Sequence, residues 1–368
     1  MNILFAVTRN PDPDGRADQF TTFKAIEHLR SLGHTVDVFI LKKNSILSLR
    51  FLFNCVTGVF HLEPFQLSLF RNNDNDQDFK EILDKKHYQR VYFHLIRGLS
   101  LRKWVPKSDL YLGMQLSQGL NFSRISDELP FGIKKILYKI EAKLCAHFEK
   151  KVVTSVNKVN FVGYQDPEFL GFSGKHDNFT VIPHGVDTSY VRGDYCGREL
   201  IFLANFASEA NKSAFYLLVE YIMPLVWLTH PNVKLSVCGL KMPKSFFKKE
   251  SERIAIKGKV ECPLAEISSH KIFLNPVRAA AGMQNKALAG FIAGVPVISF
   301  QSAIAGMPLD YPTCFRVDAS TNEFAQSICR VLDKYPETEV LNSVKNDVID
   351  QWSWGSLHRE WTSDFMNL

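Results

Sequence analysis

The chain has 368 residues, of which 46% are hydrophobic and 22% are charged, close to the globular average. This length fits two domains of roughly 150–200 residues each, and the composition excludes a disordered, collagen-like or coiled-coil chain. The formal net charge of +6 comes without a stripe of Lys and Arg interleaved with aromatic residues. It therefore argues against nucleic acid as a partner and suits a protein that handles phosphates or touches an anionic membrane surface.

Cysteine usage and hydropathy predict the compartment. The seven cysteines are scattered and none forms a C-x-x-C pair, which argues against a disulfide framework and a zinc site and favours the reducing cytoplasm. The apolar run 3–7 is too short for a signal-peptide core. Charged residues and a proline interrupt the most hydrophobic stretch, 46–70, so we do not expect it to span a membrane.

The first forty residues predict one β-α-β unit. Residues 2–7 form a buried strand, and residues 8–16 form a loop rich in Pro, Asp and Gly. Apolar residues then recur every three positions, as on one face of a helix: Phe20, Phe23, Ile26 and Leu29. Gly33 ends this helix and 35–41 is the next strand. Two strands joined by a helix predict a parallel, doubly wound sheet.

The same alternation continues along the chain. We expect later strands at 91–95, 110–114, 159–162, 180–182, 200–204, 233–238, 271–274 and 296–300. We expect helices at 134–151, which is basic and amphipathic, at 211–228 and at 282–293. The acidic run 74–78 is expected to be a solvated loop. The pattern restarts after a polar stretch that ends near Arg198, so this stretch is the expected linker.

We therefore predict an α/β fold with two Rossmann-like domains that face a central cleft. Residues 1–190 form the N-terminal, acceptor-side domain and residues 191–351 the C-terminal, nucleotide-sugar domain. The tail 352–368 carries aromatic residues at helical spacing after Ser353, a plausible N-cap. We expect this helix to pack back on the N-terminal domain, although packing within the second domain would also bury its aromatic face.

The segment 275–294 holds the strongest cluster of candidate site residues. It follows a predicted strand and contains Arg278, a small turn through Gly282, and a predicted helix start at Met283, Gln284, Asn285 and Lys286. Free backbone N–H groups at a helix start attract phosphate oxygens, and Arg and Lys add positive charge. A bound diphosphate would also relieve the unfavourable placement of a lysine at a helix start. The alternative is an ordinary surface turn with solvated charges.

Weaker candidates lie on other loops that follow strands. The segment 301–307, with Ala305 and Gly306, would let backbone groups approach a ligand closely. Asn205 and Lys212 follow the first strand of the second domain. In the first domain, Gly15 and Arg16 lie where a strand leads into a helix, but a lone glycine is not a G-x-G-x-x-G fingerprint.

His94 and Arg97 lie around the end of the strand predicted at 91–95. A histidine there could act as a general base, an acceptor anchor or an electrostatic partner, and Arg97 could contact the acceptor. A structural histidine is equally plausible. The sequence has no H-E-x-x-H, G-x-S-x-G, Walker A or metal-binding D-x-D motif, so neither a metal site nor a cofactor is expected.

Several stretches, in order, resemble the GT-B glycosyltransferases of the retaining family-4 type, also called glycosyltransferase group 1. They are NILFAVTRNPDPDG with LRSLGHTVDVF, IPHGVD at 182–187, VKLSVCG at 233–239, NPVRAAAGMQNKALAGFIAGVPVIS at 275–299 and WSWGSL at 352–357. The resemblance implies a nucleotide-diphosphate sugar as co-substrate near Gly239 and the 275–294 segment. It also implies that Arg278 and Lys286 neutralise the leaving diphosphate without a metal.

The resemblance further implies transfer with retention to a glycan or lipid-linked acceptor, in bacterial surface polysaccharide biosynthesis. Lipid-linked acceptors suggest a cytoplasmic protein that touches the inner face of an anionic membrane through helix 134–151 and the apolar stretch near 50–53. The family usually has a glutamate where this chain has Ala289. Two alternatives therefore stay open: a catalytically silent binding or scaffold subunit, and a sugar-nucleotide epimerase.

Overall fold

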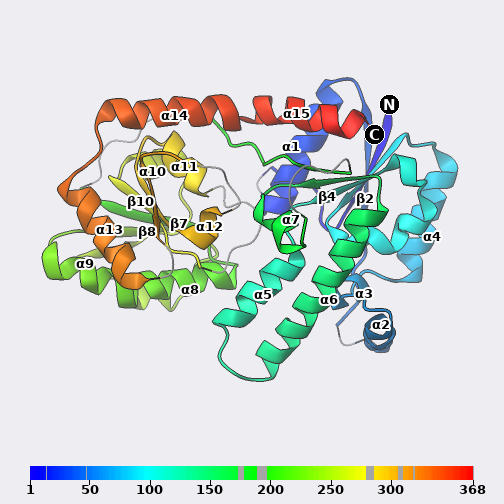
Figure 1. The fold of residues 1–368 in the computed structure, drawn as a ribbon, viewed down its shortest axis with the longest axis horizontal. Coiled ribbons are helices and arrows are strands. Elements are labelled where there is room, and N and C mark those ends of the chain that lie inside the picture. The colour runs from blue at the N-terminus through cyan, green and yellow to red at the C-terminus, as the bar shows by residue number, and fades with distance from the viewer. Residues whose placement is uncertain are drawn as a thin grey trace. The chain divides into compact units, whose positions relative to one another are not determined.

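The computed structural model describes residues 1–13, 15–46, 48–172, 178–188, 197–278, 286–305, 310–317 and 320–367. The chain divides into two compact units (Figure 1). Unit 1 comprises Met1–His184 with Leu357–Leu368, and unit 2 comprises Gly185–Ser356. The change of unit after His184 comes earlier than the expected position at residue 190. Each unit contains a 6-stranded sheet, and this α/β arrangement of two Rossmann-like sheets confirms the predicted fold class.

The sheet of unit 1 is parallel and has the order β2-β1-β3-β4-β5-β6. Its strands are β1 (Asn2–Val7), β2 (Thr35–Ile40), β3 (Arg90–His94), β4 (Leu110–Met114), β5 (Lys158–Phe161) and β6 (Phe179–Val181). The chain passes from β1 to β2 on one side and then crosses to β3 on the other side of β1. Ligands of open α/β sheets bind beyond the carboxyl ends of the strands at such a switch point, which here lies between β1 and β3.

Helices surround this sheet. They are α1 (Ala17–Ser31), α2 (Leu49–Phe60), α3 (Phe65–Ser68), α4 (Asn73–Lys85), α5 (Gln118–Glu128), α6 (Ile133–Ser155) and α7 (Gln165–Phe169), with 3-10 helices η1 (Ile96–Trp104) and η2 (Lys107–Asp109). The acidic run 74–78 is therefore the first part of a helix, α4, and not the expected loop. Asn72 caps α4 by accepting from Asn75 N, and acidic side chains suit the positive N-terminal end of a helix.

The C-terminal helix α15 (Trp354–Met366) belongs to unit 1 from Leu357 onward, which is most of its length. Trp361 and Phe365 are buried in one hydrophobic cluster with Phe5 of β1 and Tyr111 of β4. The Tyr111 hydroxyl donates to Asp364 Oδ2 at 2.6 Å. Ser353 caps α15 as predicted, because its Oγ accepts from Ser356 N at 3.3 Å.

Unit 2 has a second parallel sheet, of order β12-β11-β10-β7-β8-β9. Its strands are β7 (Leu200–Asn205), β8 (Leu235–Leu240), β9 (Ile254–Ile256), β10 (Ile272–Asn275), β11 (Val297–Phe300) and β12 (Cys314–Val317). Its helices are α8 (Glu209–Leu217), α9 (Met223–Thr229), α10 (Pro263–Ser268), α11 (Lys286–Ile292), α12 (Gln301–Ile304), α13 (Thr321–Asp333) and α14 (Thr338–Trp352), with a 3-10 helix η4 (Phe246–Lys249). The switch point of this sheet lies between β7 and β10.

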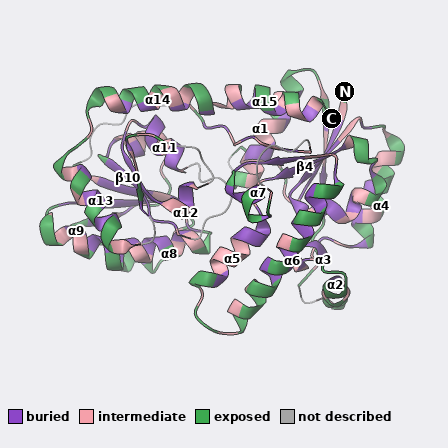
Figure 2. Ribbon diagram, viewed as in Figure 1, coloured by how far each residue is buried: buried purple, intermediate pink, exposed green. Residues whose placement is uncertain are grey.

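Two predicted segments of unit 2 differ from the structure. The helix expected at 211–228 contains a π-helical turn, Leu218–Ile222, just before Pro224, which has no N–H to donate to a regular helical bond. The segment expected as a loop at 301–307 begins with the helical turn α12. Figure 2 shows that the strands of both sheets are buried, whereas exposed residues lie mainly on the helices and loops.

Candidate functional site

Lys286 lies at the switch point of unit 2 and is held by a short chain of hydrogen bonds. Its Nζ donates to Asn211 Oδ1 at 2.7 Å. The Nδ2 of Asn211 in turn donates to the carbonyl oxygen of Asn205, the last residue of β7, at 2.7 Å. The end of β7 thus fixes Asn211, and Asn211 fixes the amine that begins α11.

Burial changes the acid–base behaviour of this lysine. Because burial disfavours the ammonium form, the pKa of Lys286 falls to about 8. An amine whose positive charge is this costly gains from a nearby anion. Ala289 lies on the same helix three positions later, so its side chain and that of Lys286 share a helix face. A glutamate at this position would have placed a carboxylate there.

Arg278 follows the end of β10, which borders this switch point together with β7. Its guanidinium carbon lies 4.9 Å from the centre of the Phe300 ring at the end of β11, a cation–π contact that orients the side chain. Ser302 Oγ donates to the Arg278 carbonyl at 2.8 Å and fixes the backbone. Arg278 and Lys286 therefore both lie at the carboxyl edge of the sheet in unit 2.

The remaining candidates of unit 2 have mostly structural contacts. Gly239 lies inside β8, and a Cβ there would meet the Ala204 carbonyl oxygen at 1.7 Å. The strand pairing therefore explains this glycine. Lys212 pairs with exposed Glu209 at 2.8 Å. Ala305 follows α12 directly. Five further candidates lie outside the described residues: Gly282, Met283, Gln284, Asn285 and Gly306.

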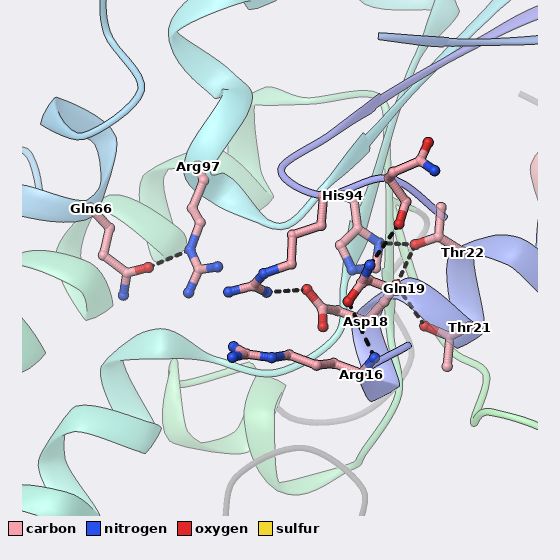
Figure 3. Close-up of polar contacts among 10 residues, drawn as sticks. Arg16, Asp18, Gln19, Thr21, Thr22, Gln66, His94 and Arg97 are labelled. Atoms are coloured by element: carbon pink, nitrogen blue, oxygen red, sulfur yellow. Dashed lines mark hydrogen bonds and ion pairs between the residues drawn. The ribbon is translucent and has the colours of Figure 1, made fainter. Parts of the chain in front are cut away.

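In unit 1, His94 ends β3 and is only 3% exposed. Its Nδ1 lies 3.3 Å from Thr22 Oγ1 on α1 (Figure 3). The Thr22 hydroxyl already donates its one hydrogen to the Asp18 carbonyl at 2.6 Å, so it can only accept from the imidazole. The Tyr92 hydroxyl lies farther from the same nitrogen, at 3.5 Å, so the shorter contact with Thr22 favours a proton on Nδ1 of the neutral ring. In this tautomer the Nε2, which is buried without a hydrogen-bond partner among the described residues, presents a lone pair.

The surroundings keep this imidazole neutral. Burial lowers the pKa of His94 to about 4, with Asp18 opposing and Arg97 and Arg9 adding to the decrease. Leu95, the next residue, has φ 66, a left-handed conformation that is unusual for a non-glycine residue. This turn separates buried His94 from Arg97 on η1, and such strained backbone is often found at functional sites.

Arg97 is half-buried, and two glutamine side chains position it. Its Nε donates to Gln66 Oε1 at 2.5 Å (Figure 3), and Gln66 Nε2 donates to Gln118 Oε1 at 2.9 Å. Gln66 lies in the first turn of α3 and Gln118 begins α5, and buried carboxylates of α6 accept from the first backbone N–H groups of both helices. Gln66 N donates to Glu141 at 3.1 Å, and Gln118 N donates to Glu149 at 2.7 Å.

The loop after β1 brings two more arginines to this edge. Arg9 forms an ion pair with Asp18 in the first turn of α1. Arg16 precedes α1, and its backbone N donates to Gln19 Oε1 at 3.2 Å while its side chain is exposed. A Cβ on Gly15 would meet Gln19 Cβ at 2.7 Å, so this glycine lets the loop approach the helix closely.

Sequence reasoning missed residues that become important only through contacts. Arg9 lies in a stretch that resembles the family but was not singled out, and Asp18, Gln66 and Asn211 lie outside those stretches. Gln66 and Asn211 lie 31 and 75 positions along the chain from the cations that they contact. The one sequence feature that could have identified them is that they follow predicted strands or lie at the starts of helices. Within the described residues, no group of three His, Cys, Asp or Glu side chains could hold a metal ion. Likewise, none of the described helices has the length and apolarity that a membrane span needs.

Known structures share this fold over nearly the whole chain. A glycosyltransferase from Rickettsia africae ESF-5 is 14% identical, with a TM-score of 0.66, and the match covers 100% of this chain and 98% of that chain. HepE from Anabaena in complex with UDP is 11% identical, with a TM-score of 0.67 and full coverage of both chains. A trehalose 6-phosphate synthase from Burkholderia multivorans is 10% identical, with a TM-score of 0.65 and coverage of 100% and 98%.

The sequence itself matches a known family over one segment. No curated protein matches the chain. Residues 197–334, which lie in unit 2 and include both Arg278 and Lys286, match the family described as Glycosyl transferases group 1. Together with the shared fold, this match supports glycosyl transfer as the class of reaction. Residues 197–334 thus match the glycosyl transferases of group 1, and the chain carries this segment on the GT-B fold that the sequence predicts.

Proposed function

We propose that this protein is a retaining glycosyltransferase that moves a sugar from a nucleotide-diphosphate sugar to a glycan or lipid-linked acceptor. We further propose that it works in bacterial surface polysaccharide biosynthesis. The observation that carries the proposal is the group 1 family match over residues 197–334, which contains two cationic side chains at the carboxyl edge of one sheet. Ligands of such sheets bind at that edge.

The proposed donor site consists of Arg278 and Lys286. A guanidinium can hold phosphate oxygens through two parallel hydrogen bonds, and a partly buried ammonium stabilises charge more than an exposed one because less water screens it. The similar HepE structures include complexes with UDP and with UDP-glucose, which supports a nucleotide diphosphate sugar as the donor here. These two positive charges would stabilise the leaving diphosphate without a divalent metal.

In the proposed reaction, the bond between the anomeric carbon and the β-phosphate oxygen breaks. A bond forms between that carbon and an acceptor hydroxyl oxygen on the same face of the sugar. The departing phosphate oxygen is then beside the attacking hydroxyl and takes up its proton. His94 presents a buried lone pair on Nε2, and we propose that it accepts a hydrogen bond from a hydroxyl of a bound sugar and so orients that sugar.

A sugar-nucleotide panel tests the function. The protein is incubated with UDP-, GDP- and ADP-sugars, with and without mixed glycan acceptors, and released nucleoside diphosphate is measured. We expect release that requires acceptor and that continues in EDTA. Binding without release would instead favour a silent binding subunit, and conversion of the sugar nucleotide without acceptor would favour an epimerase. Absence of both binding and release across the panel would contradict the proposal.

We also propose that unit 1 touches the inner face of an anionic membrane. Large apolar side chains are exposed on α2 and around the start of α6: Leu49 is 85% exposed, Phe60 83% and Phe131 92%. Helix α6 carries exposed lysines, whereas both of its glutamates are buried as helix caps. The described part of α2 has one charged residue, Arg50. Apolar side chains beside exposed lysines favour binding to anionic lipid.

A further inference from the structure

The switch point of unit 1 gathers more positive than negative charge. Arg9, Arg16 and Arg97 all lie on the loops that follow β1 and β3, and Asp18 on α1 is the carboxylate that pairs with Arg9. For Arg97 and Arg16, the described residues offer no carboxylate within ion-pair distance. Because His94 is neutral, the cluster of these four charged residues has two unmatched positive charges.

The contacts of Arg97 leave its terminal amino groups available. Its Nε donates to the neutral amide oxygen of Gln66 at 2.5 Å, which fixes the plane of the guanidinium without neutralising it. Gln66 is itself held by Gln118 and by the cap from Glu141. Burial and the charge of Arg9 both lower the pKa of Arg97. A half-buried, well-positioned cation of this kind is stabilised by an anion that approaches its open side.

A second, independent observation points to a ligand at the same place. His94 is 3% exposed, and its Nε2 has no hydrogen-bond partner among the described residues. The charges of Asp18, Arg97 and Arg9 all act on this imidazole, so it lies close to the arginine cluster. A buried acceptor without a donor costs free energy unless a ligand supplies one. In Figure 3, Arg16 and Arg97 extend from different elements toward the same side of Asp18.

We infer that the acceptor of the proposed transfer carries an anionic group, a phosphate or a carboxylate, that Arg97 and Arg16 bind beside a hydroxyl that donates to His94. The identification of this ligand as the acceptor rests on the proposed function. A guanidinium fork matches the planar pair of oxygens that both groups present. The other source of such an anion is the donor diphosphate, but Arg278 and Lys286 in unit 2 already supply positive charge for it.

Direct binding to the full-length protein tests this inference without turnover. The probes are glucose, glucose 6-phosphate and glucuronate, which share a sugar ring and differ in charge, together with UDP. Their affinities are measured by calorimetry for the wild type, Arg97→Gln and Arg97→Lys. Lys85→Gln is the matched control, because it removes one positive charge from an exposed helical pair on the surface of unit 1. Thermal unfolding verifies that each variant is folded.

We expect glucose 6-phosphate and glucuronate to bind about tenfold tighter than glucose, or more, as charge-assisted hydrogen bonds would give. Arg97→Gln should remove this preference, Arg97→Lys should keep part of it, and Lys85→Gln should keep all of it. The affinity for UDP should be the same in all variants. If Arg97→Gln misfolds, loss of the phosphate preference in Arg16→Gln, with Lys85→Gln unchanged, supports the same site.

Two results would overturn the inference. One is equal binding of charged and uncharged sugars by the wild type. The other is a loss of UDP affinity in Arg97→Gln as large as the loss for glucose 6-phosphate, which would assign the cluster to the donor diphosphate. A wild type that prefers the charged sugars yet binds no nucleoside diphosphate would support the anion site while contradicting the proposed function, so the two can fail separately.

Discussion

The Nζ of Lys286 donates a hydrogen bond to Oδ1 of Asn211 at 2.7 Å, although 75 positions separate the two residues in the chain. Asn211 is a neutral partner and cannot compensate the positive charge, so burial lowers the pKa of the lysine to about 8. This hydrogen bond holds the amine in position to bind an anion. If that anion is a diphosphate, the affinity for it should depend on the protonation of Lys286.

We predict that the affinity for UDP falls as pH rises above about 8. The free protein loses the Lys286 proton near this pH, whereas a bound diphosphate stabilises the ammonium and raises its pKa. Binding above pH 8 must therefore take up a proton and becomes weaker. In Lys286→Arg the charge persists to much higher pH, so the dependence should flatten. Calorimetry at pH 7, 8 and 9 measures the UDP affinity of both proteins. The same dependence of affinity on pH in the wild type and in Lys286→Arg would show that Lys286 does not bind the diphosphate.

Arg278→Ala should raise the free energy of the donor step by about 1–3 kcal/mol, because one charge-assisted contact is lost. The measurement is kcat/KM for the donor. Arg253→Ala is the matched control, because Arg253 also stacks on an aromatic ring of unit 2, with its guanidinium carbon 4.1 Å from the Trp227 ring centre. Equal losses in both variants would show that the effect comes from stability and not from the donor site.

His94→Phe keeps an aromatic ring at the end of β3 but removes the lone pair of Nε2. We expect kcat/KM to fall by a factor that corresponds to about 1–3 kcal/mol of lost transition-state stabilisation, the cost of one lost hydrogen bond to the sugar. Thr22→Val removes the hydroxyl that holds the proton on Nδ1 and should cost less, because the ring remains. Steady-state rates that are unchanged in a folded His94→Phe protein would assign this histidine a structural role alone.

Anionic liposomes should carry the protein upward in flotation, and neutral ones should not. Phe131→Ser combined with Ile133→Ser should reduce flotation, because both side chains are exposed at the start of α6. Leu228→Ser is the matched control: Leu228 is 80% exposed but lies on α9 in unit 2. Flotation that responds equally to the control, or that is the same with neutral liposomes, would remove the membrane proposal.

Unit 1 should lose stability as pH falls from about 6.5 toward 4. His358 on α15 stacks on His28 of α1 with ring centres 4.5 Å apart. Burial, followed by the charges of His28 and Lys24, lowers the pKa of His358 to about 4. The unfolded state therefore binds its proton first, near pH 6.5, and folding loses up to about 3 kcal/mol by pH 4.

The variant His358→Phe keeps the ring contact but cannot be protonated. Thermal unfolding between pH 7 and 4 should therefore show a smaller decrease in Tm for His358→Phe than for the wild type. His87→Asn, at an exposed histidine of unit 1, should behave like the wild type. A decrease in Tm that is the same in all three proteins would show that other groups cause the acid sensitivity.

The sequence predicted best those strands and helices in which buried apolar side chains recur at regular intervals along the chain. The strands predicted at 2–7 and 110–114 agree with β1 and β4 at both ends, because a central parallel strand is a nearly continuous apolar run. The placement of Arg278 and Lys286 after β10 could also be predicted, because the loops that follow parallel strands meet at one edge. Short or polar elements were missed, including β9, β12 and the start of α4, since few residues give a weak periodic signal.

By itself, the sequence determined the doubly wound fold of each unit, the edge of each sheet that carries polar residues and the class of reaction that its motifs resemble. Only the tertiary structure decided which residues act together. It placed Asn211 under Lys286, Gln66 beside Arg97 and Thr22 against His94. The reason is physical: periodicity depends on neighbours along the chain, whereas the pKa of a buried group and the proton position of an imidazole depend on neighbours in space.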